Sequence, residues 1–171
     1  AGQAGARVIG FPEGFVPAHP VWIHHHAATG TLANKLAVEL FKNSVEIPGP
    51  ETDALGEAAR DANAYVIVGA CEKMPGTIGT MFNTQIYFGP DGSLIGKHQK
   101  IMPTVGERLV HMGGFGDTFG AFETEFGPMS ALICGENSNP LAVFALTAEG
   151  TRLHVMSWPN HFPTSGDPLR N

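Results

Sequence analysis

Residues 127–150 read G-P-M-S-A-L-I-C-G-E-N-S-N-P-L-A-V-F-A-L-T-A-E-G, and the interpretation of the whole chain starts from them. The apolar run 129–133 has the length of a buried β-strand. Cys134 follows this run directly, and a short turn then leads into a helical pattern over residues 141–148. Gly150 can end that helix in the left-handed conformation. This stretch therefore predicts a strand, a cysteine-bearing turn and a helix.

The position of Cys134 suits a nucleophile. A thiol between the end of a strand and the start of a helix is held rigidly, and a helix start favours negative charge. A single cysteine beside an apolar run is, however, more often an inert core residue. The position alone leaves both interpretations open.

Composition limits the classes of protein that the chain can belong to. Its 171 residues suit one domain, and 43% apolar with 15% charged residues is typical of a globular protein. Ten Lys and Arg against 16 Asp and Glu give a net charge of −6, which argues against a nucleic-acid surface. Two cysteines in different settings, Cys71 and Cys134, predict no disulfide framework and favour a reducing, cytoplasmic location. No apolar run approaches the ~20 residues of a spanning helix, and we recognise no signal peptide, so no membrane partner is expected.

The rest of the chain predicts an α/β fold with sheets of mixed direction. Two hairpins are expected, one turned at residues 89–92 and one turned at residues 126–128, with helices between the strands. Strands are predicted at 6–11, 64–71, 82–88, 93–99, 118–125, 129–133 and 152–158, and helices at 31–41, 52–63 and 141–148.

Polar residues stand at or just beyond the ends of several predicted strands. Glu13 follows the first strand, Lys100 follows residues 93–99, and Glu107 comes seven residues after Lys100. A cysteine that attacks an electrophilic carbon needs a base for its proton and a cation for the charge that develops. A carboxylate, an ammonium and the Cys134 thiol meet those needs, although each residue alone is more often structural.

Histidines offer no comparable grouping. His24, His25 and His26 are adjacent, and three successive imidazoles cannot all face one ion from a helix or a strand. We therefore predict no metal site there. Neither His98 nor His154 sits in a recognisable partner motif, which disfavours a cysteine protease.

Four sequence blocks together resemble the nitrilase superfamily of carbon–nitrogen hydrolases. They occur in the order typical of that family and cover most of the chain. The blocks are F-P-E at residues 11–13, G-K-H-Q-K-I-M-P-T at 96–104, G-E-R-L-V at 106–110 and L-I-C-G-E-N-S-N-P-L-A at 132–142.

The resemblance implies a role for each polar residue. Glu13 corresponds to the general base, Lys100 to the stabilising cation, Cys134 to the nucleophile and Glu107 to an additional glutamate that orients lysine and substrate. It also implies an α-β-β-α sandwich and a reaction without metal or organic cofactor. Members pair two sandwiches across a helical face, and nitrilases often extend the pairing into spirals, so a homo-oligomer is expected.

The residues after Cys134 look like those of true nitrilases. Amidase and carbamoyl-hydrolase branches usually carry an aspartate-containing continuation, whereas this chain has Glu136 and Asn137. Many nitrilases have tryptophan directly after the cysteine, where this chain has Gly135. The expected function is hydrolysis of a nitrile to the carboxylic acid and ammonia through a thioimidate and a thioester. An amidase or carbamoyl hydrolase, and a non-catalytic assembly module on the same fold, are the alternatives.

Two further expectations concern structural roles and extent. Glu136 and Asn137 are expected to hold the turn and cap the next helix. Phe15, Trp22 and residues 158–162 are pocket candidates, with core packing an equal explanation. The chain opens with Ala1, and family members begin before the F-P-E strand and continue beyond the W-P pair at 158–159. We expect residues 1–171 to be a single hydrolase domain lacking the first strand and helix and the C-terminal part, and to be poorly stable and inactive alone.

Overall fold

The larger of two sheets carries the N-terminal half of the site. The computed structural model describes residues 1–27 and 29–159. Strands β1 (Val8–Gly10), β2 (Tyr65–Lys73), β3 (Met81–Phe88) and β4 (Leu94–Gln99) form this sheet in that order. β1 is parallel to β2, and the other two pairs are antiparallel. The predicted hairpin between β3 and β4 is confirmed.

The smaller sheet carries the cysteine. β5 (Met129–Ile133) and β6 (Leu153–Ser157) pair in parallel, and α3 (Pro140–Ala148) connects them. A parallel pair needs a crossover of this kind, because the chain must return to the same end of the sheet.

The predicted strand 118–125 is wrong. Only an isolated antiparallel bridge between Phe122 and Met129 remains of the expected hairpin. Phe122 exchanges two backbone hydrogen bonds with Met129, but the Ala121 N–H donates to Glu149 and the Glu125 N–H donates to the Tyr65 hydroxyl. Phe122 itself packs on Tyr87 with ring centroids 4.6 Å apart. The apolar side chains of residues 118–125 therefore contribute to core packing, and the segment does not form a β-strand.

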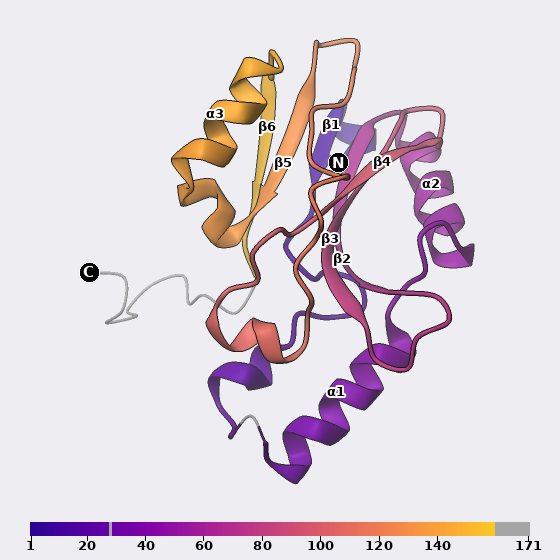
Figure 1. The fold of residues 1–171 in the computed structure, drawn as a ribbon. Coiled ribbons are helices and arrows are strands. Elements are labelled where there is room, and N and C mark those ends of the chain that lie inside the picture. The colour runs from indigo at the N-terminus through magenta and orange to yellow at the C-terminus, as the bar shows by residue number, and fades with distance from the viewer. Residues whose placement is uncertain (28, 160–171) are drawn as a thin grey trace, which may run out of the picture.

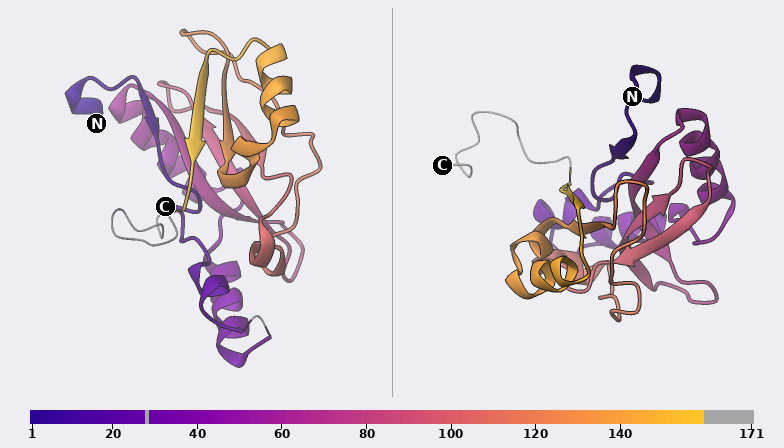
Figure 2. Two further views of the ribbon diagram at one scale, coloured as in Figure 1. Left: turned by 90° about the vertical axis from the view of Figure 1, so that its left-hand side faces the viewer. Right: turned by 90° about the horizontal axis from the view of Figure 1, so that it is seen from above.

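Successive side chains of β2 and β3 point to opposite faces of the large sheet, and each face packs against a different layer of the fold. On one face, Val66, Val68, Ile86 and Phe88 pack against Ala59 of α2 (Pro50–Ala62). On the other face, residues 67 and 87 pack against residues 129 and 131 of β5. The order is therefore α2, large sheet, small sheet, α3, as Figures 1 and 2 show. This confirms the predicted α-β-β-α sandwich.

The remaining helical segments lie around the edge of the sandwich. α1 (Thr31–Asn43) lies below it in Figure 1 and contributes Leu40 to a cluster with Cys71 and Met81. Leu32, predicted on the same stripe, is half-exposed. Short 3₁₀ helices complete the chain at η1 (Gly2–Ala4), η2 (Val21–His24), η3 (Val105–Leu109) and η4 (Cys134–Ser138).

Two helix starts differ from expectation. α2 begins at Pro50 rather than Thr52, because proline suits the first helical position and the Thr52 hydroxyl accepts from Gly49 N–H at 2.8 Å. Asn139, not Asn137, caps α3 by accepting from the Leu141 and Ala142 N–H groups.

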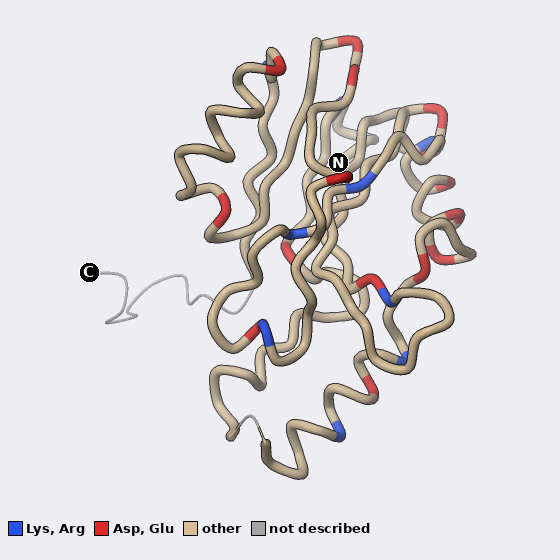
Figure 3. The backbone as a smooth tube through the Cα atoms, viewed as in Figure 1, with Lys and Arg blue, Asp and Glu red and all other residues tan. Residues whose placement is uncertain are grey.

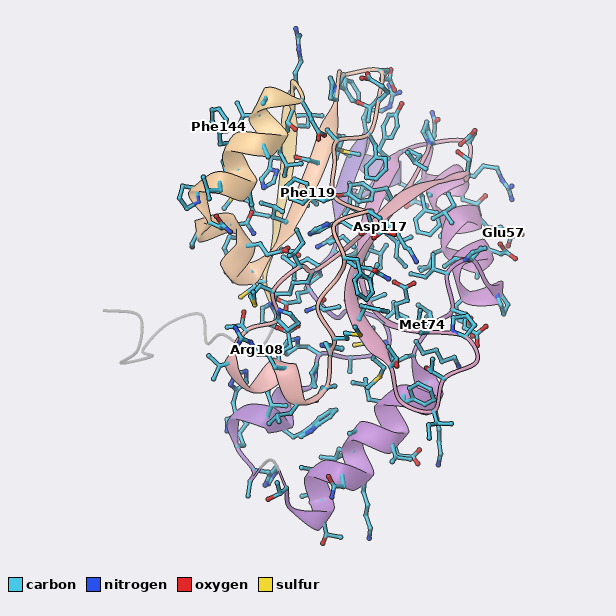
Figure 4. The ribbon with its side chains drawn as sticks, in the orientation of Figure 1. Glu57, Met74, Arg108, Asp117, Phe119 and Phe144 are labelled. Atoms are coloured by element: carbon cyan, nitrogen blue, oxygen red, sulfur yellow. The ribbon has the colours of Figure 1, made fainter. Side chains whose placement is uncertain are left out.

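The outer side of α3 is apolar and exposed. Leu141 and Phe144 are 77% and 71% exposed, and Phe144 is labelled on α3 in Figure 4. Lys and Arg are scattered among separate elements of the drawn chain, whereas acidic residues gather along α2 (Figure 3). Among the helices of residues 1–27 and 29–159, none combines the length and apolarity needed to cross a membrane.

Candidate active site

Strand alternation brings Lys100 beside Asn83. The ladder between β3 and β4 continues past Gln99, because Lys100 N–H donates to Asn83 C=O at 2.8 Å. Both side chains then lie on the face that carries Tyr87, which is the face between the two sheets. A lysine at this strand end is therefore enclosed rather than solvated.

Glu13 reaches the same place from the end of β1. The Glu13 N–H donates to Trp158 C=O at 3.2 Å, so the turn after β1 is tied to the end of β6. Gly69 of β2 lies directly beneath this turn. A Cβ at Gly69 would lie 2.2 Å from Pro12 O and 2.8 Å from Glu13 Cα, so glycine permits the approach.

Cys134 stands on a strained turn at the end of β5. Its φ of +51° lies in the left-handed region, which non-glycine residues rarely adopt. It is half-buried and lines a cavity of about 70 Å³ together with Glu13, Lys100 and Glu107. The structure therefore brings all four predicted site residues to one cavity.

The two carboxylates and the ammonium form a buried cluster. Lys100 Nζ lies 3.0 Å from Glu13 Oε1 and 2.6 Å from Glu107 Oε2. The side chains of Glu13, Lys100 and Glu107 are all at most 3% exposed. Asn83 Nδ2 donates to both carboxylates, at 2.7 Å to Glu13 Oε1 and 2.5 Å to Glu107 Oε1.

The two carboxylates differ in what they bind. Glu107 also accepts from Thr104 N–H at 2.9 Å and contacts His111 Nδ1 at 3.2 Å, so both of its oxygens are occupied. Glu13 uses only Oε1 for Lys100 and Asn83. Its Oε2 is buried and has no hydrogen-bond partner within the described part of the chain. This oxygen therefore has a lone pair available to accept a proton.

The pKa values follow from these contacts. Burial raises the pKa of Glu13 more than the nearby Lys100 ammonium lowers it. Burial also raises the pKa of Glu107, but the hydrogen bonds from His111, Lys100 and Thr104 together hold that pKa well below the usual range. Burial lowers the pKa of Lys100, but the Glu13 and Glu107 carboxylates raise that pKa by more, so it lies above the usual value. Glu107 and Lys100 are thus held charged, while Glu13 is made a better proton acceptor.

Cys134 is a thiol at rest. Burial and the Glu13 carboxylate raise its pKa, and Lys100 and the Gly135 N–H oppose them only in part. A helix start was expected to favour the thiolate, but η4 is a single short 3₁₀ turn and burial outweighs it. The nucleophile therefore needs a base.

The cavity wall includes residues that the sequence did not point to. They are His19, Ile23, His24 and Thr104. Pro159, from the predicted pocket segment 158–162, also lines the cavity. Phe15 instead packs on Phe11 with ring centroids 4.9 Å apart, and Trp22 packs against the cluster containing Leu40. Residues 160–162 of the predicted pocket segment lie outside the described residues.

Cys71 belongs to the core, as its strand predicted. It is buried on β2, and its pKa is raised to about 12 by burial and by Glu107 and Glu13. The thiol contacts Ala18 C=O at 3.4 Å. Over residues 1–27 and 29–159, no group of three or more His, Cys, Asp or Glu side chains could hold a metal ion.

Asn83 and His111 are the contacts that sequence reasoning missed. Asn83 begins a run of three polar residues in β3, a pattern that indicates solvent exposure, yet it is buried and bonds to Glu13 and Glu107. His111 follows Glu107 by four residues, one helical turn, and that spacing was the available indication.

Comparisons with known proteins identify the family of the chain. The profile of the carbon-nitrogen hydrolase family matches residues 1–168. A nitrilase from Bacillus sp. (strain OxB-1) is 39% identical over 166 residues, which are 97% of this chain and 47% of that protein. A cyanide hydratase from Gibberella zeae is 35% identical over 160 residues, 93% of this chain and 44% of that protein.

The fold has solved counterparts. A crystal structure of a carbon-nitrogen hydrolase from Helicobacter pylori G27 superposes with a TM-score of 0.73, at 16% identity, over 98% of this chain and 53% of that one. The chain spans about half the length of the curated relatives it matches. On the family match over nearly all its residues, the chain belongs to the carbon-nitrogen hydrolase family, the nitrilase superfamily.

Proposed function

We propose that the complete protein hydrolyses an organic nitrile to the carboxylic acid and ammonia, with Cys134 as the nucleophile. The observation that carries the proposal is the buried Glu13–Lys100–Glu107 cluster that shares a cavity with Cys134. Relatives named nitrilase, at 34–39% identity, support a nitrile as the substrate.

The reaction begins with a proton transfer from Cys134 to Glu13. The raised pKa of the thiol makes a base necessary, and the raised pKa of Glu13 makes its carboxylate a fitting acceptor. Oε2 of Glu13 accepts this proton, because Oε1 already accepts hydrogen bonds from Lys100 and Asn83.

The thiolate then attacks the nitrile carbon and forms a thioimidate. Negative charge develops on the nitrile nitrogen, which takes the proton held by Glu13. Lys100 Nζ and the Gly135 N–H are the donors placed to stabilise that charge in a water-poor site.

Two water molecules complete the cycle. The first, activated by Glu13, adds to the thioimidate carbon, and loss of ammonia leaves a thioester on Cys134. The second adds to the thioester, releases the carboxylic acid and restores the thiol. Throughout, Glu107 remains an anion, because its bonds from Lys100, Asn83, Thr104 and His111 hold it so, and it keeps Lys100 a cation.

Parallel assays with a nitrile and its amide test the proposal. The complete protein should release ammonia from the nitrile, and Cys134→Ala should abolish the release. Cys71→Ala is the matched control, since it removes a buried thiol outside the cavity, and it should retain the activity. Faster release from the amide would replace the proposal with an amidase, and no release from either would refute it.

We also propose that the complete protein is a homo-oligomer, with a dimer as the unit of any longer spiral. The exposed apolar side chains of α3 support an assembly surface there, because apolar groups gain free energy when covered. Light scattering over a range of concentrations measures the mass, and a monomer at all of them would contradict this.

A further inference from the structure

Glu136 joins the two sheets beside the cavity. Its Oε1 accepts from Ile101 N–H at 2.8 Å, and its Oε2 accepts from Ile133 N–H at 3.0 Å. His98 Nε2 lies 2.9 Å from the same Oε2. His98 lies in β4 of the large sheet and Ile101 follows the end of that strand, whereas Ile133 is the last residue of β5 in the small sheet.

The two backbone donors adjoin the proposed catalytic residues. Ile101 directly follows Lys100, and Ile133 directly precedes Cys134. One buried carboxylate thus binds the backbone N–H groups of the residue after Lys100 and of the residue before Cys134. Both bonds end on one side chain, so Glu136 ties the end of β4 to the end of β5.

His98 holds that carboxylate in place. Because Glu136 is the acceptor for two backbone N–H groups, the His98 contact is best made by a proton on Nε2. The opposite nitrogen, Nδ1, has no hydrogen-bond partner within the described residues. His98 is buried and meets Phe119 edge-on at 5.8 Å, which fixes its ring.

We propose that Glu136 is a positioning residue: its carboxylate sets the distance between Cys134 and Lys100 by tying the strand ends that carry them. It touches neither substrate nor reacting atoms, and it extends the predicted role of holding the cysteine turn to holding that turn against the lysine strand. The inference rests on the proposed function, because the distance matters for attack on the nitrile carbon. A misplacement of about 1 Å costs on the order of a hundredfold in rate.

Glu136→Gln is the informative substitution. Glutamine keeps the size but has one oxygen and one NH₂ group, so in either orientation a backbone N–H faces another donor. Glu72→Gln is the matched control. Glu72 is also buried and accepts from the Thr84 hydroxyl at 2.8 Å, from Gln99 at 3.0 Å and from Lys97, but it lies on the sheet face away from the cavity.

Two measurements on the complete protein decide the matter. In Glu136→Gln, amide hydrogen exchange should accelerate by roughly tenfold or more at Ile101 and Ile133, while β3 keeps its protection. With a nitrile substrate, kcat per titrated active site should fall by about thirtyfold or more, and KM should change by less than about threefold. Glu72→Gln should show neither effect at equal folded fraction.

Should Glu136→Gln fail to fold, His98→Leu replaces it. This substitution removes one donor and no backbone bond, and it should lower kcat by roughly three- to tenfold at constant KM. Unchanged exchange at Ile101 and Ile133, or a kcat equal to that of Glu72→Gln, would overturn the inference. Absence of ammonia release from the unsubstituted protein would instead refute the proposed function, and the exchange result would still decide whether Glu136 ties the strands.

Discussion

Replacing each site carboxylate by its amide should separate the two glutamates by the sign of their effect on stability. Both Glu13→Gln and Glu107→Gln are expected to abolish nitrile hydrolysis. Only Glu107→Gln should destabilise the fold at neutral pH, because its anion is stabilised by the protein, whereas the Glu13 anion is disfavoured by burial.

The magnitude for Glu107 follows from its partners. The carboxylate is bonded to Lys100, Asn83, Thr104 N–H and His111. Removing one partner of a buried ion pair costs about 3–5 kcal/mol. Lys100 keeps Glu13 at 3.0 Å, so the lower end, about 3 kcal/mol, is expected.

The magnitude for Glu13 is smaller. In Glu13→Gln the amide oxygen still accepts from Lys100 and Asn83, and Lys100 keeps its bond to Glu107 at 2.6 Å. Burial no longer acts against a charge at this position. The free energy of unfolding should therefore be unchanged or raised, within about 1 kcal/mol.

Urea unfolding at several pH values provides the assay. The folded pKa of Glu107 is lowered, so its stabilisation is full above the unfolded pKa of about 4.3 and disappears as pH falls through the folded pKa. The deficit of Glu107→Gln should hence shrink in acid. The folded pKa of Glu13 is raised, so any advantage of Glu13→Gln exists above that pKa and vanishes as pH falls to the unfolded value. Equal destabilisation by both substitutions at pH 7 would refute the division of roles.

Three further outcomes are expected. Gly69→Ala should lower the free energy of unfolding by about 1–3 kcal/mol and should also lower kcat, because the new Cβ would displace the turn that carries Glu13. A thermal melt and an ammonia-release assay measure the two effects. A fully active and equally stable variant would contradict the close approach of Gly69 to this turn. When kcat/KM is plotted against pH, the midpoint of the acid limb should lie above pH 4.5, the ordinary pKa of a glutamate, because burial raises the pKa of Glu13. A midpoint at or below pH 4.5 would argue for another base. Phe144→Ser should change the free energy of unfolding of the monomer by no more than about 0.5 kcal/mol, yet it should weaken self-association measured by light scattering. If the particle mass of the variant equals that of the unsubstituted protein at every concentration, α3 is not part of the assembly surface.

The strand ends were the part of the site that the sequence could predict. Short apolar runs mark β1 and β5, and the turn at residues 89–92 marks the start of β4, so Glu13, Lys100 and Cys134 could be placed just beyond these strands. The resemblance added Glu107 and the sandwich. The four side chains come from separate segments, and only the packing of the two sheets brings them to one cavity.

The missed features depend on tertiary contacts. Asn83 lies in a run of three polar residues, yet a second sheet packs on the face of β3 that carries Asn83 and Tyr87. Residues 118–125 have strand-like composition, but Phe122 fills the space above Gly96, and the Ala121 and Glu125 N–H groups bond to side chains elsewhere in the fold. Local pattern cannot reveal either a covering layer or a competing partner.

The most direct test of the account is the site of the covalent intermediate. The complete protein is mixed with a nitrile, quenched in acid within the first turnover, and analysed by intact mass and peptide mapping. We predict an acyl or imidate adduct on Cys134, absent from Cys134→Ala and slower to form in Lys100→Ala. An adduct on Cys71, or substrate turnover with no adduct at any time, would contradict the assignment of Cys134 as the nucleophile.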